Sequence, residues 1–134
     1  MIVYADTSAL LAVLDRDDVN HAEAKAIWSE LLGNGATLYC SNYVVAECCA
    51  LIQRRLGEPA LRVFLTDIVP MLSIHWIEQR IHQSAVEALL HSKKKGPSLV
   101  DRTSFAVMRF LGIERAFAFD EDFQREGFES ITTD

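Results

Sequence analysis

The sequence predicts an α/β fold, with a parallel sheet of four to five short strands and helices on both faces. Short apolar runs alternate along the chain with longer segments that carry apolar residues at helical spacing. Strands that alternate with helices in this way are typical of βαβ units. Half of the 134 residues are hydrophobic and no Gly-, Pro- or Ser-rich linker divides them. We therefore expect one domain over residues 1–134.

Start and stop signals delimit each predicted element. Asp6-Thr7-Ser8, Asn20 and Ser98 are residue types that favour helix starts, and Pro59 suits the first turn of a helix. Gly33, Gly57 and Gly112 are expected to end helices. In chain order the sequence predicts a strand at 2–5, helices at 7–14 and 21–32, a strand at 37–40, helices at 42–56 and 59–69, a strand at 73–76, helices at 78–92 and 98–112, a strand at 116–119, a short helix at 121–126 and an edge strand at 130–132.

The net charge, the cysteines and the absence of targeting patterns limit the classes of protein to which this sequence could belong. The formal net charge of −6 argues against binding nucleic acid through a simple basic surface, but it does not exclude an enzyme that acts on nucleic acid. Cys40, Cys48 and Cys49 form neither a disulfide framework nor a zinc pattern, so we expect buried thiols in a reducing cytosol. The sequence shows no signal-peptide pattern and no apolar run of membrane-spanning length. A cytoplasmic protein is expected.

Four carboxylates are expected to converge at one edge of the predicted sheet. Asp6 follows the first strand and Asp120 the fourth, so both should emerge at the carboxyl ends of parallel strands, where sites form in open α/β sheets. Glu47 lies early in the helix after the second strand, and Asp101 lies in the first turn of the helix that Ser98 begins.

Each acid also has a structural explanation. Asp6 and Asp120 suit helix N-caps, Asp101 has capping-box spacing to Ser98, and Glu47 could face solvent. The joint pattern is more informative, because Glu47 and Asp101 interrupt apolar stretches and four converging acids would repel one another without a cation. A site made only of oxygen ligands suits Mg²⁺ or Mn²⁺. The four histidines show no spacing that would indicate zinc.

The chain resembles the PIN-domain ribonucleases, especially the VapC-type toxins of toxin–antitoxin pairs. The resemblance follows the whole chain in order, with motifs at matching spacing. These motifs are I-V-Y-A-D-T-S-A-L at residues 2–10, Asn20-His21 with Ala24, the segment from Ser41 to Glu47, S-L-V-D-R-T-S-F at residues 98–105, and A-F-D-E-D-F at residues 118–123 followed by Gly127-Phe128.

This resemblance implies an α/β/α sandwich that cleaves RNA internally with Mg²⁺ or Mn²⁺. It carries catalytic and metal-ligand roles to Asp6, Glu47, Asp101 and Asp120, and supporting roles that orient carboxylates or a water to Thr7, Ser8 and Ser104. Asp122 departs from the common pattern and is either a further metal ligand or a solvated acid at a helix start. A homodimer and a cognate antitoxin are the protein partners that the resemblance implies.

Basic and apolar residues outside the acids suggest where partners bind. Lys93, Lys94 and Lys95 precede the Asp101 helix and are either a solvated loop or a phosphate clamp, which Arg54, Arg55 and Arg102 could extend. The helices predicted at 42–56 and 59–69 carry many apolar residues, some of which could contact a second copy or an antitoxin peptide.

Two other functions remain open from the sequence alone. A phosphatase of the haloacid-dehalogenase type also places an Asp after its first strand, but Ser8 stands where that family usually has a second Asp. A catalytically inactive PIN-like or receiver-like binding module is the second alternative, which the presence of all four acids disfavours.

Overall fold

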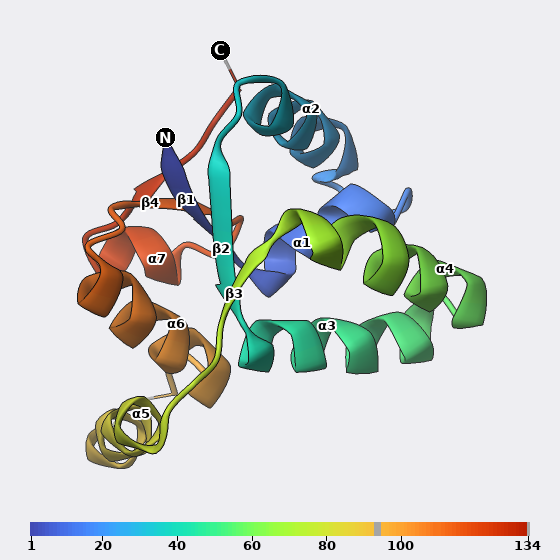
Figure 1. The fold of residues 1–134 in the computed structure, drawn as a ribbon. Helices are drawn as coiled ribbons and strands as arrows, with labels where there is room; N and C mark the ends of the chain where they lie inside the picture. Colours follow the sequence, from blue (N-terminus) through green and yellow to red (C-terminus); the bar gives the residue numbers. More distant parts are fainter. Residues whose placement is uncertain (93–94, 134) are drawn as a thin grey trace.

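Five short parallel strands form the sheet at the centre of the computed structural model, which describes residues 1–92 and 95–133 (Figure 1). Their spatial order is β3-β2-β1-β4-β5, so the first strand of the chain is the central one. From β1 the chain builds the sheet outward in one direction and then returns to add β4 and β5 on the other side. The strands are β1 (Ile2–Ala5), β2 (Thr37–Ser41), β3 (Ser73–His75), β4 (Arg115–Phe117) and β5 (Glu129–Ser130).

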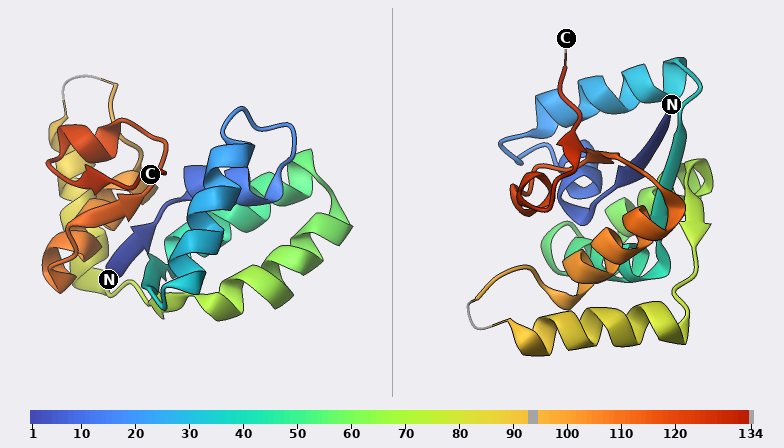
Figure 2. Two further views of the ribbon diagram at one scale, coloured as in Figure 1. Left: turned by 90° about the horizontal axis from the view of Figure 1, so that it is seen from above. Right: turned by 90° about the vertical axis from the view of Figure 1, so that its left-hand side faces the viewer.

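Helices cover the sheet on both sides, which confirms the predicted α/β fold (Figures 1 and 2). One group contains α1 (Thr7–Leu14), α2 (His21–Gly33), α3 (Asn42–Arg55) and α4 (Glu58–Val63). The other group contains α5 (Gln79–His91), α6 (Leu99–Leu111) and α7 (Asp122–Arg125). In the described residues, no helix combines the length and the apolar character that crossing a membrane requires.

The central strand β1 is the most deeply buried part of the sheet. Val3, Tyr4 and Ala5 are fully buried, as expected for a parallel strand with helices on both faces. The Tyr4 hydroxyl is 2.8 Å from the hydroxyl of Ser104 on α6, so a buried hydrogen bond joins the central strand to that helix. Because a buried hydroxyl that loses its partner is costly, this link favours the observed packing of α6 on the sheet.

The predicted helix 59–69 is the largest departure from expectation. It begins one residue earlier, as α4 at Glu58, and widens into a π-helical turn at Phe64–Ile68 before a 3₁₀ turn at Val69–Met71. Pro70 lacks a backbone N–H, so it cannot continue the regular α-helical hydrogen bonds. The N–H of Val69 instead reaches the carbonyl of Phe64, and Phe64 and Ile68 both stay buried.

Smaller differences occur at other element ends. The fourth strand was expected over 116–119 but ends at Phe117, because Ala118 and Phe119 turn away from the sheet toward Asp120. The edge strand was expected over 130–132 but lies at Glu129–Ser130. Asn20 precedes α2 as predicted, yet its side chain makes no capping hydrogen bond.

The hydrogen bond between Tyr4 and Ser104 can be tested by stability measurements. Tyr4→Phe should lower the free energy of unfolding by about 1–2 kcal/mol, because it leaves the Ser104 hydroxyl buried without this partner. The double variant Tyr4→Phe/Ser104→Ala should lose less than the sum of the two single losses, as measured by urea unfolding. Tyr39→Phe on β2 is the matched control, and strict additivity would contradict the coupling.

Candidate metal centre

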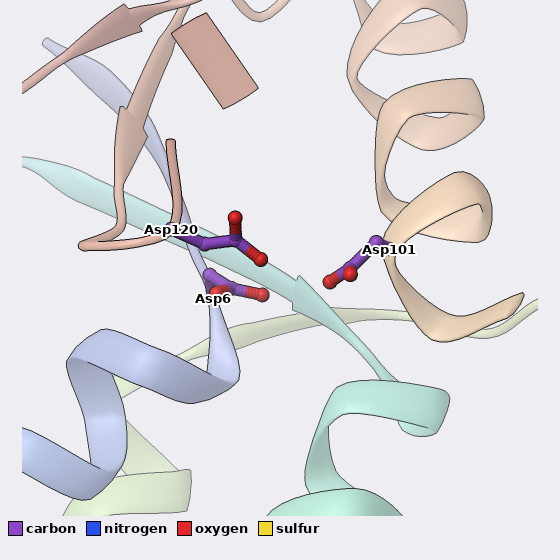
Figure 3. Close-up of side chains that lie close together, drawn as sticks. All are labelled: Asp6, Asp101 and Asp120. Atoms are coloured by element: carbon purple, nitrogen blue, oxygen red, sulfur yellow. The ribbon is translucent and has the colours of Figure 1, made fainter. Parts of the chain in front are cut away.

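Three carboxylates meet at the carboxyl edge of the sheet (Figure 3). Asp6 follows β1, Asp101 lies in the first turn of α6, and Asp120 lies in the loop after β4. Each offers one oxygen, and these oxygens all lie within 4.8 Å of one another. The strand order reverses between β1 and β4, which is the position where open α/β sheets bind ligands.

Each of these side chains is held through one of its oxygens by the backbone near its own position. Asp6 is the N-cap of α1, and its Oδ2 accepts hydrogen bonds from the N–H of Ser8 at 3.2 Å and the Ser8 hydroxyl at 2.7 Å. Asp101 Oδ2 accepts from the N–H of Ser98 in a complete capping box. Asp120 Oδ1 accepts from the N–H of Asp122 at 2.9 Å. For Asp6 and Asp101 the capping and metal-ligand interpretations are therefore compatible, since a second oxygen of each carboxylate is left for a ligand. Asp120 was predicted as an N-cap but precedes Glu121, the N-cap of α7, and it likewise keeps a second oxygen.

Ser8 also ties the loop after β4 to the start of α1. Its hydroxyl donates to Asp6 and accepts from the N–H of Phe119 at 3.0 Å. Beside it, the N–H of Asp6 donates to the carbonyl of Phe117 at 3.0 Å. These bonds hold the backbone just before Asp120 against the exit of β1, and Ser8 contacts a carboxylate of the cluster directly.

Burial and mutual repulsion disfavour negative charge in this cluster. Burial raises the pKa of Asp6 to about 7, with a further rise from the charge of Asp101 that the Ser8 hydrogen bonds partly oppose. Burial likewise raises the pKa of Asp101, and the charges of Asp120 and Glu47 add to it. Asp6 is only 2% exposed, and its Oδ1 is buried without a hydrogen-bond partner.

A divalent cation fits these observations. It would supply a counter-charge to the buried Asp6 carboxylate, whose Oδ1 has no hydrogen-bond partner, and offset the repulsion among the three carboxylates. A set of ligands made only of carboxylate oxygens is typical of hard cations such as Mg²⁺ and Mn²⁺, and less typical of zinc or copper. Among the described residues, Asp6, Asp101 and Asp120 form a group that could hold such an ion.

Glu47 lies beside the cluster but outside the three-carboxylate group. It is half-buried on α3, and its charge contributes to the raised pKa values of Asp101 and the Cys48 thiol, where burial is the larger cause. The sequence predicted four convergent acids, and the structure brings three of them together with the fourth close by.

The remaining predicted site residues have other surroundings. The carboxylate of Asp122 pairs with Arg125 at 2.8 Å and lies outside the three-carboxylate group, although its N–H supports Asp120. Ser104 is fully buried, and its hydroxyl hydrogen-bonds to that of Tyr4 in the core. Thr7 is buried at the start of α1, close to the Cys48 thiol.

The basic residues of the predicted clamp lie in two separate parts of the chain. Lys93 and Lys94 lie outside the described residues, and Lys95 is exposed shortly before α6. Arg102 follows Asp101 directly and is half-buried. Arg54 and Arg55 are in the last turn of α3, seven and eight residues beyond Glu47.

Comparison with known proteins gives the same assignment as the geometry. The sequence pattern of the PIN domain matches residues 3–129. This chain belongs to the PIN domain family. It is 31% identical over 131 residues to the 23S rRNA-specific endonuclease VapC20 of Mycobacterium tuberculosis, an alignment that covers 97% of this chain and 98% of that protein.

Solved structures agree with this family assignment. The crystal structure of M. tuberculosis VapC20, described as a toxin that cleaves the sarcin-ricin loop, superposes with a TM-score of 0.88 at 30% identity, covering 99% of this chain and 100% of that one. VapBC2 from Rickettsia felis, bound to a promoter DNA fragment, matches at a TM-score of 0.72 and 13% identity over the full length of both chains. FitAcB from Neisseria gonorrhoeae matches at 0.69 and 17% identity, covering 98% of this chain and 97% of that one. The latter two establish a shared fold.

The raised pKa of Asp6 predicts a pH-dependent stability. Its pKa is about 7 in the folded protein against an ordinary value of 3.8, so the folded state binds the proton more tightly. Without metal, the free energy of unfolding should therefore fall as pH rises from about 4 to about 7. Asp6→Asn should flatten this slope and stabilise the metal-free protein at pH 8 by roughly 2–4 kcal/mol.

Urea unfolding at a series of pH values, with a chelator present, measures this effect. Adding Mg²⁺ or Mn²⁺ at pH 8 should restore stability to the wild type and leave Asp6→Asn nearly unchanged, because the cation replaces the proton as the partner of Asp6. Equal pH slopes in the two proteins would contradict this account.

Proposed function

We propose that this protein is a metal-dependent endoribonuclease, the toxin of a VapBC-type toxin–antitoxin pair. The observation that carries the proposal is the cluster of Asp6, Asp101 and Asp120 at the switch point of a PIN domain. Full-length similarity to a protein named as an RNA-specific endonuclease supports it.

The chemistry requires Mg²⁺ or Mn²⁺ at the carboxylates. The bound ion would lower the pKa of a water and neutralise charge on the scissile phosphate. Asp6 supplies a buried anchor, and Asp101 and Asp120 are half-buried and complete the ligand set toward solvent. Glu47, whose charge acts on Asp101, would orient the attacking water or extend the ligand set.

Arg102 is the cation best placed to contact the RNA backbone. Its Nε donates to the carbonyl of Pro97 at 3.0 Å, which holds the side chain at the start of α6 beside Asp101. The terminal nitrogens of the guanidinium are then available for a phosphate. Lys95, exposed before the same helix, can lengthen this contact.

The apolar residues of the α3–α4 segment support a protein partner. Val44, Cys48 and Ile52 of α3 are buried in the core, whereas Val63 and Leu65 are each 44% exposed. Exposed apolar side chains on a helical segment suit docking of an antitoxin peptide or of a second copy of the chain.

The surroundings of Ser8 disfavour the phosphatase alternative. That function needs an acid two residues after Asp6, but this position is occupied by Ser8, whose hydroxyl hydrogen-bonds to Asp6 and Phe119.

Metal-dependent RNA cleavage is the first test of the proposal. The purified protein should cleave RNA with Mg²⁺ or Mn²⁺ and lose this activity with a chelator. Asp6→Asn or Asp101→Asn should reduce cleavage by at least roughly a hundredfold, since loss of residues that merely orient metal ligands already costs 10–100-fold. Glu30→Gln on α2 is a charge-matched control. Metal-independent cleavage, or a fully active Asp6→Asn protein, would overturn the proposal, and a folded protein that cleaves no RNA would favour the binding module.

A second test addresses Arg102. Arg102→Ala should weaken RNA binding and reduce the slope of log K against log salt by about 1, the value for one lost phosphate contact. Arg115→Ala is the control, because Arg115 pairs with Glu129 at 3.5 Å near the start of β4, away from the carboxylates. Filter binding at several salt concentrations measures both variants. An unchanged slope for Arg102→Ala would exclude Arg102 as a phosphate contact.

A further inference from the structure

A hollow of about 170 Å³ adjoins the metal centre, and most of the residues that line it lie outside the three-carboxylate cluster. Asp120 belongs both to the three-carboxylate cluster and to the wall of this hollow. A chain whose phosphate is bound at the cluster would therefore have a neighbouring nucleotide within reach of it. Other residues of the wall are Glu23 at the start of α2, Phe119, Glu121, Gln124 of α7 and Thr132.

The charge of this lining excludes a phosphate as the occupant. Glu23, Asp120 and Glu121 line the hollow, and no Lys or Arg of the described chain does. Phosphate groups would be repelled there, so only the uncharged part of a nucleotide can enter. The half-buried Phe119 lies in the same wall, and unstacked RNA bases commonly pack on aromatic side chains.

The three acids are not equally available. Asp120 belongs to the metal centre, and Glu121 pairs with Arg125 at 3.0 Å. Among the described residues, no cation lies within ion-pair distance of the Glu23 carboxylate, which is exposed. One free carboxylate, which only accepts hydrogen bonds, matches a ligand edge with two adjacent N–H donors.

We propose that this hollow is a base-binding subsite in which Glu23 accepts hydrogen bonds from the N1–H and N2 amino group of a guanine next to the cleaved phosphate. The other bases fit less well, because an acceptor atom beside each of their Watson–Crick N–H groups would face the carboxylate. The subsite rests on the proposed ribonuclease function, since it assumes that RNA is bound at the metal centre. Glu23 is then a specificity-determining residue, and the basic residue Arg102 contacts the backbone.

Binding of short RNAs to an Asp101→Asn protein tests this subsite while the RNA stays intact. The probes are fluorescein-labelled uridine heptamers with guanosine, inosine or adenosine at the central position, measured by fluorescence anisotropy with Mg²⁺ present. We expect guanosine to bind about tenfold more tightly than adenosine, with inosine intermediate because it lacks the N2 amino group. Adding Glu23→Gln should remove this ranking, and adding Glu30→Gln, the same change further along α2, should preserve it.

The outcomes separate this inference from the proposed function. If Glu23→Gln removes the ranking, the subsite is supported, even if the wild type cleaves none of these RNAs. Such a lack of cleavage would count only against the proposed nuclease activity. Equal binding of the three probes, or equal effects of Glu23→Gln and Glu30→Gln, overturns the subsite even if cleavage is efficient. If Glu23→Gln instead weakens binding of N-acetylarginine amide and leaves the RNA ranking unchanged, the hollow receives a cationic side chain of a protein and the proposal is wrong.

Discussion

The carboxyl edge of the sheet must hold three carboxylates close together against their electrostatic repulsion. Charges of one sign within 4.8 Å of one another would drive their backbone segments apart unless those segments were held independently. Three backbone N–H groups provide part of that support, from Ser8, Ser98 and Asp122. The pairing of β1 with β4 and the Ser8–Phe119 hydrogen bond provide the rest. A metal ion can then bind to oxygens that are already in place.

The three clustered carboxylates are not equally buried, so the cluster has an inner side and an outer side. Asp6 lies at the end of the fully buried strand β1, whereas Asp101 and Asp120 are half-buried at the surface. An ion held here would be anchored by the buried carboxylate, with the two outer carboxylates on its solvent side. The surroundings of the outer ligands also differ, with Arg102 next to Asp101 and an acidic hollow next to Asp120. An RNA chain that crosses the centre would therefore meet a cation on one side and carboxylates on the other.

Local signals in the sequence predicted the features that local hydrogen bonding decides. The Ser98–Asp101 capping box, the glycine at the end of α6 and the helix start at Asp6 all occur as expected. Asp6 and Asp120 were predictable because strand exits in a parallel sheet share one edge, and Asp101 because it interrupts an apolar stretch at a helix start. Contacts that depend on packing between distant segments were not. The partner of Ser104, the pairing of Asp122 with Arg125 and the π-helical turn before Pro70 depend on tertiary contacts or on small differences in helical hydrogen bonding.

The order of the strands has a consequence for protein synthesis. Asp6 is synthesised before β4 and Asp120, which lie beside it in the folded protein and complete the three-carboxylate cluster. A nascent polypeptide that has not yet released β4 from the exit tunnel has a central strand open on one side and lacks one of its three clustered ligands. The three-carboxylate cluster therefore cannot form during synthesis until β4 and Asp120, which follow α6, have emerged.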